Sequence, residues 1–206
     1  MAEQGRSHRR TNQMERTRSA IVAAARELAD SGAEIRMSAI AAEARVSEAT
    51  AYRHFPDLVS LLRAAVLVED QVAVLRSVAE GDDPVERIGQ AAEILGRAVL
   101  RREGAVRALV SSTIAKPETA KERPAHRFGL IEHALAPWVE RNGLAGHEAV
   151  AQLVRDLAVV ISAESLFTLI DLCGLGPQEA VAGLVATARR TTAAAVATIT
   201  PAADRR

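Results

Sequence analysis

Apolar positions along this chain recur with the period of α-helices from near Thr17 almost to the C-terminus. In the first such segment, residues 17–31, Gly32 follows the last turn, where a glycine typically ends a helix. The apolar side chains of this segment follow an i, i+3, i+4, i+7 pattern and define one helical face: Ile21, Ala24, Ala25 and Leu28. Alternating runs of β-branched residues, which mark strands, do not occur. The pattern therefore predicts an all-α protein.

The next segment predicts two short helices joined by a tight turn, at residues 38–44 and 48–55. Ser47 stands at the N-cap position of the second helix, where its hydroxyl can accept a backbone N–H of the first turn. A short helix with a polar outer face, braced by another helix, is typical of a helix-turn-helix that enters the DNA major groove. The apolar side chains expected to hold the two helices together are Ile40, Ala41, Ala44 and Val46.

The rest of the chain predicts a series of longer helices. A fourth helix is expected to begin at Pro56 or Asp57 and to continue to about Leu75, long enough to connect two regions. A later helix holds Phe128 and Trp138 and stops at residues 142–143. The remaining helices are expected over residues 84–102, 106–115, 148–172 and 178–199, with a polar loop at 117–124.

The predicted helix over residues 148–172 is apolar around most of its circumference. Its acidic residues Asp156, Glu164 and Asp171 fall within an arc of about 80°, because each residue advances a helix by about 100°. One packing partner cannot cover so wide an apolar surface. We therefore expect this helix and the one over 178–199 to form a four-helix bundle with the same helices of a second subunit. A core formed within one chain is the alternative.

Charge is balanced overall, with 26 basic and 26 acidic residues, which argues against binding of a polyanion by bulk attraction. Residues 1–56 hold nine basic and seven acidic residues, whereas residues 57–206 hold 17 basic and 19 acidic residues. The positive charge thus lies next to the predicted helix-turn-helix, where a phosphate backbone would lie. Residues 1–15 are expected to form a disordered basic tail, and a solvated tail without DNA contacts is the alternative.

Other chemistry is not indicated. The single cysteine, Cys173, excludes an intrachain disulfide and a multi-cysteine zinc site, and its apolar neighbours predict burial at a helix end. Gly-rich phosphate loops, metal-ligand clusters and nucleophile–base pairs are missing, so we expect no enzyme activity, metal or cofactor. No apolar run reaches about 18 residues and the polar N-terminus lacks a signal peptide, which predicts a cytoplasmic protein.

One window of residues resembles a known family, the TetR family of transcriptional regulators. The resemblance implies a helix-turn-helix DNA-binding domain at residues 16–56 and a ligand-binding and dimerisation domain at residues 57–206. It also implies a homodimer that binds double-stranded DNA and a small-molecule effector. The residues that carry the resemblance are Ile40-Ala41, Ala44, Val46-Ser47, Tyr52-Arg53-His54-Phe55 and Leu61.

The candidate base contacts lie on the second short helix. Glu48, Ala49 and Thr50 are expected deepest in the groove, with Thr50 on a thymine methyl or base edge and Glu48 on a cytosine amino group. A helix-start carboxylate favoured by the helix dipole is the alternative for Glu48. Arg53 is the candidate for a guanine or phosphate contact, and a solvated arginine is the alternative.

The candidate phosphate contacts flank that helix. The resemblance implies that Tyr52 and His54 contact backbone phosphates, although the sequence alone suits Tyr52 equally well to a core position with a wet hydroxyl. Thr17 is expected at the start of the first helix, where it either meets a phosphate or caps that helix.

Three positions depart from the family's pattern. Arg45 replaces the usual turn glycine, which predicts a positive φ at a cost of roughly 1 kcal/mol for a residue with a Cβ. Arg36 replaces the usual Ser or Thr cap, so that Ser38 is expected to start the first short helix two residues later. Leu58 replaces a lysine that commonly faces phosphate. Arg45, Arg53 and the basic tail are expected to restore part of the phosphate contact.

The resemblance further implies a repressor that leaves a palindromic operator when a small apolar or amphipathic molecule binds its C-terminal domain. A helical small-molecule-binding dimer with no DNA role is the alternative. For each candidate ligand-binding residue a plain core position is the alternative. The candidates lie on helices that line the cavity in similar proteins: Leu95, Val99, Thr113, Phe128, Ile131, Trp138 and Phe167.

Overall fold

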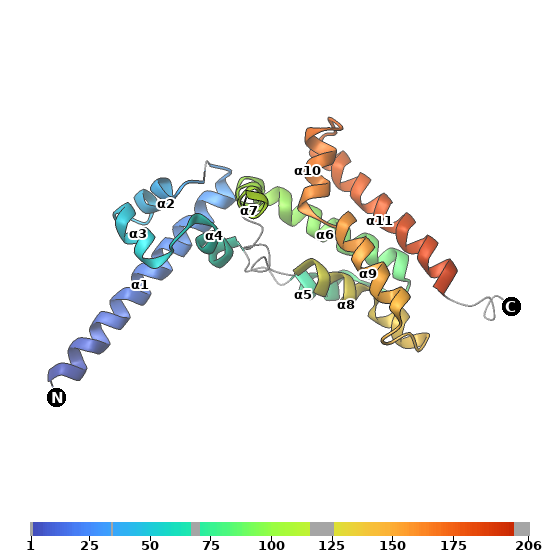
Figure 1. Ribbon diagram of the computed structural model, residues 1–206, viewed down its shortest axis with the longest axis horizontal. Coiled ribbons are helices and arrows are strands. Elements are labelled where there is room, and N and C mark those ends of the chain that lie inside the picture. The colour runs from blue at the N-terminus through green and yellow to red at the C-terminus, as the bar shows by residue number, and fades with distance from the viewer. Residues whose placement is uncertain (1, 34, 67–70, 116–125, 200–206) are drawn as a thin grey trace. The chain divides into compact units, whose positions relative to one another are not determined.

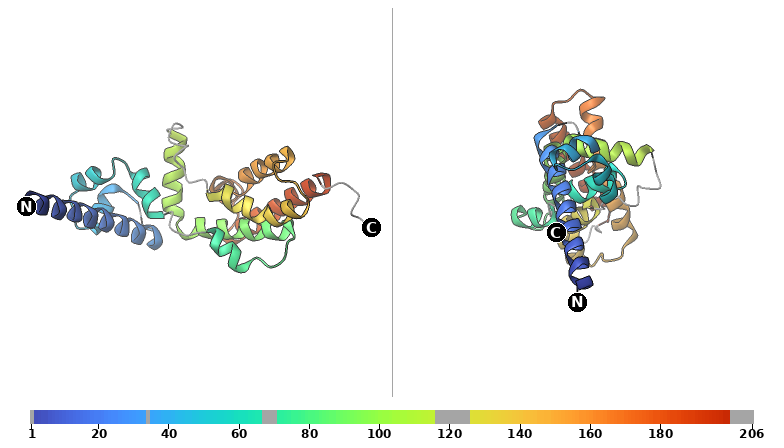
Figure 2. Two further views of the ribbon diagram at one scale, coloured as in Figure 1. Left: turned by 90° about the horizontal axis from the view of Figure 1, so that it is seen from below. Right: turned by 90° about the vertical axis from the view of Figure 1, so that its left-hand side faces the viewer.

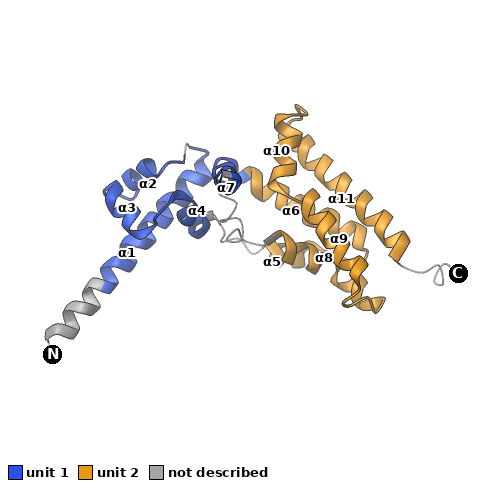
Figure 3. Cartoon of the chain, viewed as in Figure 1, with its two compact units in different colours: residues 1–69, 101–124 blue, residues 70–100, 125–206 orange. Residues whose placement is uncertain are grey.

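The computed structural model describes residues 2–33, 35–66, 71–115 and 126–199, and within these ranges every regular element is an α-helix. This confirms the predicted all-α fold. The chain divides into two compact units, coloured separately in Figure 3. Unit 1 comprises Met1–Glu69 and Arg101–Pro124, and unit 2 comprises Asp70–Leu100 and Ala125–Arg206.

Among its described residues, unit 1 contains five helices: α1 (Ala2–Ser31), α2 (Met37–Glu43), α3 (Glu48–His54), α4 (Leu58–Val66) and α7 (Glu103–Ala115). Helix α1 packs on both α2 and α4, and α2 packs on α3 (Figure 1). The predicted apolar face of α1 and the seam between α2 and α3 meet in one core. Its fully buried members include Ile21, Ala25, Ile40, Ala51 and Leu61.

Helix α1 begins at Ala2, so it starts well before the predicted position near Thr17 and runs through most of the segment predicted as a disordered tail. The segment before Thr17 contains several good helix formers, including Glu, Gln and Arg, and no proline. The apolar periodicity that sets the predicted start begins only at Ile21, so it marks where the helix meets the core and not where the helix begins.

Arginine side chains hold other helices of unit 1 in place. From α1, Arg26 donates from Nε to the carbonyl of Ala65 at 2.9 Å and from Nη2 to that of Ala64 at 3.5 Å. These carbonyls belong to the described part of α4. Next to α7, Arg102 pairs with Asp30 of α1 at 2.7 Å. Both contacts lie within unit 1.

Unit 2 contains α5 (Gln71–Val78), α6 (Pro84–Arg101), α8 (His126–Arg141), α9 (Glu148–Val160), α10 (Ala163–Asp171) and α11 (Pro177–Ile199). Helices α9 and α10 both pack on α11, α8 packs on α9, and α5 packs on α8. Figure 2 gives two further views of the helices. Helices α6 and α11 approach closely at Gly96, because a Cβ there would stand 3.1 Å from a methyl of Val181.

A buried arginine compensates for the proline inside α8. Pro137 has no N–H, so the carbonyl of His133, four residues earlier, loses its helical donor. Arg87, which is 7% exposed, donates to that carbonyl from Nη2 at 3.3 Å and to Ala134 from Nε at 2.9 Å. A third bond joins its Nη1 to the carbonyl of Gly81 at 3.3 Å. Arg87 thereby fixes α6 against the interrupted turn of α8.

The prediction of a single helix over residues 148–172 is wrong. The segment forms two helices, α9 and α10, separated at Ile161 and Ser162. Ser162 has extended backbone and caps α10, since its hydroxyl accepts the N–H of Ser165 at 3.1 Å. The acidic residues on either side of this break therefore do not share the continuous arc that the sequence suggested. The predicted loop at 117–124 lies outside the described residues. Residues 67–70 do so as well, and the predicted continuation of the fourth helix to Leu75 passes through them.

Candidate nucleic-acid interface

The turn between α2 and α3 is closed by backbone hydrogen bonds and one strained residue. The N–H of Arg45 donates to Ala42 at 3.0 Å, and that of Val46 donates to Ala41 at 2.9 Å. Arg45 has φ 54°, the one positive φ at a non-glycine position among the described residues. The predicted left-handed conformation is therefore confirmed, and an arginine occupies it in place of the glycine that such a turn favours.

Ser47 caps α3 as predicted. Its hydroxyl accepts the backbone N–H of Thr50 at 3.1 Å and meets the Thr50 hydroxyl at 2.8 Å. The second bond occupies part of the Thr50 side chain that was proposed to contact a base edge. Glu48 lies in the first turn of α3 and is exposed, so its position suits both a base contact and interaction with the helix dipole.

Helix α3 has one buried face and one exposed face. Ala51 is fully buried and Phe55, at the C-cap, is 2% exposed, so these two residues anchor the helix on the core of unit 1. Tyr52 is 48% exposed, which excludes the predicted alternative of a core tyrosine in this chain. Arg53 is exposed and His54 half-buried. The outer face therefore presents an aromatic hydroxyl and an arginine, both of which can donate to phosphate oxygens.

Two predicted caps are corrected by the structure. Arg36, not Ser38, is the N-cap of α2; its backbone is extended, and its side chain makes no capping bond. Ser38 lies inside the helix, so the expected two-residue shift does not occur. Thr17 lies in the middle of α1 and its hydroxyl donates to the carbonyl of Gln13 at 3.0 Å. Thr17 therefore cannot offer a free helix-start N–H to a phosphate.

Leu58 and Asp57 have structural roles at the start of α4. Leu58 packs against the core of unit 1, which accounts for an apolar residue where the family commonly has lysine. The carboxylate of Asp57 accepts the N–H of Ser60 at 2.7 Å and so uses one of the free donors of that helix end.

Arg18 was missed by the sequence analysis. Its guanidinium carbon lies 4.3 Å from the centre of the Phe55 ring, and its Nη1 donates to the carbonyl of His54 at 3.3 Å. It thus contacts the last turn of α3 from α1. The available signal was its spacing, because Arg18 stands three residues before buried Ile21 and therefore near the edge of the same face.

The predicted ligand-binding residues do not all lie in the same unit, and they are not all buried. Thr113 lies on α7 in unit 1, where its hydroxyl donates to helix carbonyls, whereas the other six lie in unit 2. Phe128 is 37% exposed, with the Arg127 guanidinium 5.9 Å from its ring centre. The buried apolar members of the set are Leu95, Val99, Ile131, Trp138 and Phe167.

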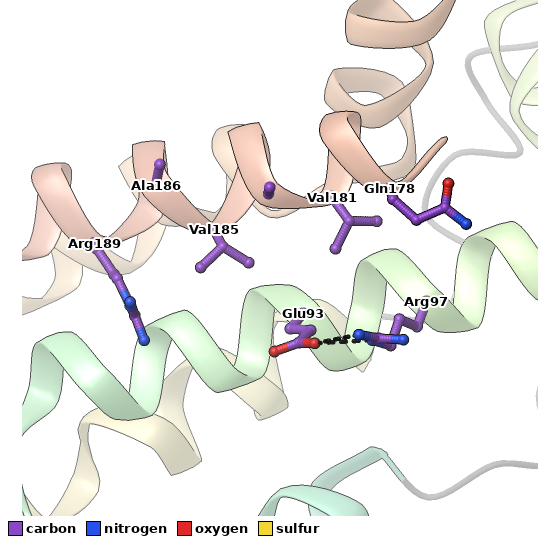
Figure 4. Close-up of a pocket in the computed structure, with 8 residues that line it drawn as sticks. Glu93, Arg97, Gln178, Val181, Val185, Ala186 and Arg189 are labelled. Atoms are coloured by element: carbon purple, nitrogen blue, oxygen red, sulfur yellow. Dashed lines mark hydrogen bonds and ion pairs between the residues drawn. The ribbon is translucent and has the colours of Figure 1, made fainter. Parts of the chain in front are cut away.

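A groove of about 410 Å³ lies between α6 and α11 and is lined by none of the seven predicted residues. Figure 4 shows Val181 and Val185 of α11 facing α6, with the Glu93–Arg97 pair on the opposite side. At one end, Arg189 pairs with Glu86 at 2.6 Å. Outside the groove, the prediction that Cys173 is buried is wrong, because its side chain is exposed after the end of α10.

The capped turn and the exposed face of α3 define a helix-turn-helix DNA-binding protein. Residues 20–65 match the model of the bacterial regulatory proteins of the tetR family. The chain therefore contains the DNA-binding domain of this family over residues 20–65 and is a DNA-binding transcriptional regulator. No curated protein and no solved structure matches it significantly.

Two further findings concern the described part of the chain. None of its helices combines the length and the apolar character needed to cross a membrane. It also contains no group of three or more His, Cys, Asp or Glu side chains placed to hold a metal ion.

Proposed function

We propose that the protein is a homodimeric repressor that binds a palindromic operator and is released by a small apolar or amphipathic effector. The observation that carries the DNA-binding part is the exposed outer face of α3, held by a Ser47 cap and by the buried Ala51 and Phe55. A rigid short helix with donors on its outer face can read base edges and phosphates together. In a bacterial cell, such a regulator acts in the cytoplasm, where the DNA is.

Apolar side chains left exposed by the single chain support a dimer. Val159 of α9 is 72% exposed and Leu172, which follows α10, is 82% exposed. Helix α11 packs on α9 and α10 but exposes small residues on its other side, including Ala182, Ala193 and Ala197. A second copy on these surfaces would place two α3 helices in one particle. Palindromic half-sites about 34 Å apart require such a spaced pair.

In this proposal, the effector releases the protein from the operator by shifting the population of dimer conformations. A small molecule that binds the C-terminal region more tightly in one dimer conformation favours that conformation. If that conformation changes the distance between the two α3 helices, operator affinity falls. The buried residues Leu95, Val99, Ile131, Trp138 and Phe167 supply an apolar environment for such a molecule. Phe128 remains part of the proposed site, and Thr113, which lies in unit 1, remains a separate candidate for ligand contact. The alternative of a binding protein without a DNA role is disfavoured by the tetR-family match.

Selection of DNA by the purified protein tests the proposal. The intact protein, incubated with a pool of random-sequence duplexes at moderate salt, is expected to enrich a palindromic site, and sedimentation is expected to show a dimer. The variant Arg53→Ala is expected to bind the selected duplex about tenfold more weakly while remaining dimeric. Enrichment of no sequence by folded dimeric protein would contradict the proposal, and loss of the dimer in Arg53→Ala would show a structural role.

A further inference from the structure

Two arginines of α1 contact backbone carbonyls of two other helices in unit 1. Arg18 donates to the carbonyl of His54 in the last turn of α3, and Arg26 donates to the carbonyls of Ala64 and Ala65 in α4. The two arginines are eight residues apart, just over two helical turns, and so point to similar sides of α1. Carbonyls at a helix C-terminus carry partial negative charge and favour cations.

The contact of Arg18 has a second component. Its guanidinium carbon stands 4.3 Å from the centre of the Phe55 ring, within the range of a cation–π interaction. Phe55 is the C-cap of α3 and is 2% exposed, so its ring is fixed in the core. One guanidinium thus contacts both the last carbonyl of α3 and the aromatic ring that anchors its end.

Helix α3 needs such support because it is only seven residues long. Isolated helices of this length are not stable in water, so tertiary contacts fix its position. Its N-terminal end is held by Ser47 and the turn, and its inner face by Ala51. The exposed residues Tyr52 and Arg53 lie directly before the end that Arg18 contacts. A small rotation of that end would displace both side chains relative to DNA.

We propose that Arg18 is a positioning residue, which orients the C-terminal end of α3 for sequence-specific reading and need not touch DNA itself. This inference rests on the proposed operator binding. It distinguishes Arg18 from Arg16, an exposed arginine of α1 that is expected to act on DNA only through its charge. Specific binding needs a correctly oriented helix, whereas non-specific binding follows mainly from the number of phosphates neutralised.

The test compares Arg18→Ala with Arg16→Ala on two probes, the duplex selected by the wild-type protein and a scrambled duplex of equal length. Arg16 is an exposed arginine two residues away and about 200° around α1, so its loss removes the same charge from another face. Arg18→Ala is expected to weaken binding to the selected duplex about tenfold and to leave scrambled-duplex affinity and the salt dependence unchanged. Arg16→Ala is expected to affect both duplexes equally.

The variant Arg18→Lys keeps the charge but lacks the planar guanidinium that stacks on Phe55. It is expected to recover only part of the specific affinity, and it carries the test if Arg18→Ala does not fold. Three results would overturn the inference: unchanged specific affinity in Arg18→Ala, an equal loss on both duplexes with a salt slope reduced by about one, or full recovery in Arg18→Lys. If the wild-type protein selects no duplex, the proposed function fails instead.

Discussion

Two serine hydroxyls cap helices in this chain with nearly the same geometry but in different surroundings. Ser47 accepts the N–H of Thr50 at 3.1 Å and meets its hydroxyl at 2.8 Å, whereas Ser162 accepts the N–H of Ser165 at 3.1 Å and meets its hydroxyl at 3.0 Å. Ser47 is exposed, and Ser162 is 4% exposed. The same local motif therefore starts α3 from an exposed serine and α10 from a buried one.

Burial changes what each cap contributes. At the α9–α10 break, the hydroxyls of Ser162 and Ser165 both donate to the carbonyl of Val159, at 2.9 Å and 2.6 Å. This carbonyl lies at the end of α9, and water has little access to Ser162. A buried group that loses its partner is not rescued by solvent. At the α2–α3 turn, water can replace the hydrogen bond from the Thr50 N–H to Ser47 if that bond is lost. The main consequence of losing it is therefore a less fixed position of α3.

The largest effect is expected for the buried cap. Ser162→Ala should lower the free energy of unfolding by about 2 kcal/mol, because it removes the acceptor for Ser165 N–H inside the protein. Urea denaturation followed by circular dichroism measures this change. Thr168→Ala is the matched control, since Thr168 is exposed and its hydroxyl donates to the carbonyl of Glu164 in the same helix. Its effect should stay within about 0.5 kcal/mol. An equal loss of unfolding free energy in both variants would show that burial does not increase the contribution of the Ser162 cap.

The exposed cap should have a smaller effect on stability. Ser47→Ala is expected to lower the free energy of unfolding by about 1 kcal/mol, the typical contribution of an N-cap. Because it also frees the N-terminal end of α3, it should weaken binding to the selected duplex. Denaturation and fluorescence anisotropy measure the two effects. Ser38→Ala, inside α2, is the control and should change neither. A loss of stability in Ser47→Ala as large as that in Ser162→Ala would remove the contrast between the two regions.

The two caps also differ in how well the sequence predicts them. Ser47 follows Arg45-Val46 between two short apolar patterns, so the change from one helix to the next is visible in the sequence. Ser162 stands within a long apolar stretch without glycine or proline, and helical periodicity continues across it. The break depends on hydrogen bonds to Val159 and on packing against α11, which single-sequence patterns do not contain. The sequence argument for a dimer assumed one continuous helix over residues 148–172, so this break removes that argument.

The candidate DNA-binding site shows the same limit. Its exposed face and the Ser47 cap follow from local spacing, the positive φ of Arg45 follows from the family resemblance, and all three are confirmed. The contact of Arg18 with the end of α3 joins residues 36 positions apart, so it depends on how α1 crosses that helix. The exposure of Cys173 likewise depends on where α10 ends and not on its apolar neighbours.

The smallest effect is expected at the strained residue of the α2–α3 turn. Arg45→Gly relieves a left-handed conformation that costs a residue with a Cβ about 1–2 kcal/mol, but glycine gives the unfolded chain more freedom, which offsets about 0.4–1 kcal/mol. The expected net result is a gain of about 0.5 kcal/mol in the free energy of unfolding. Arg45→Ala keeps the strain and removes the charge, so it should not share this gain.

Comparing the two Arg45 variants on DNA separates strain from charge at this turn. If the Arg45 side chain neutralises a phosphate, both variants should bind selected and scrambled duplexes more weakly and with a salt slope reduced by about one. Stability should then rise only in Arg45→Gly, so that stability and DNA affinity change in opposite directions in one variant. Such a result would mean that this chain keeps an unfavourable backbone conformation for the sake of a phosphate contact. Equal stability of both variants would show instead that the turn tolerates a side chain without strain, and unchanged DNA binding would leave the arginine without a role in phosphate recognition.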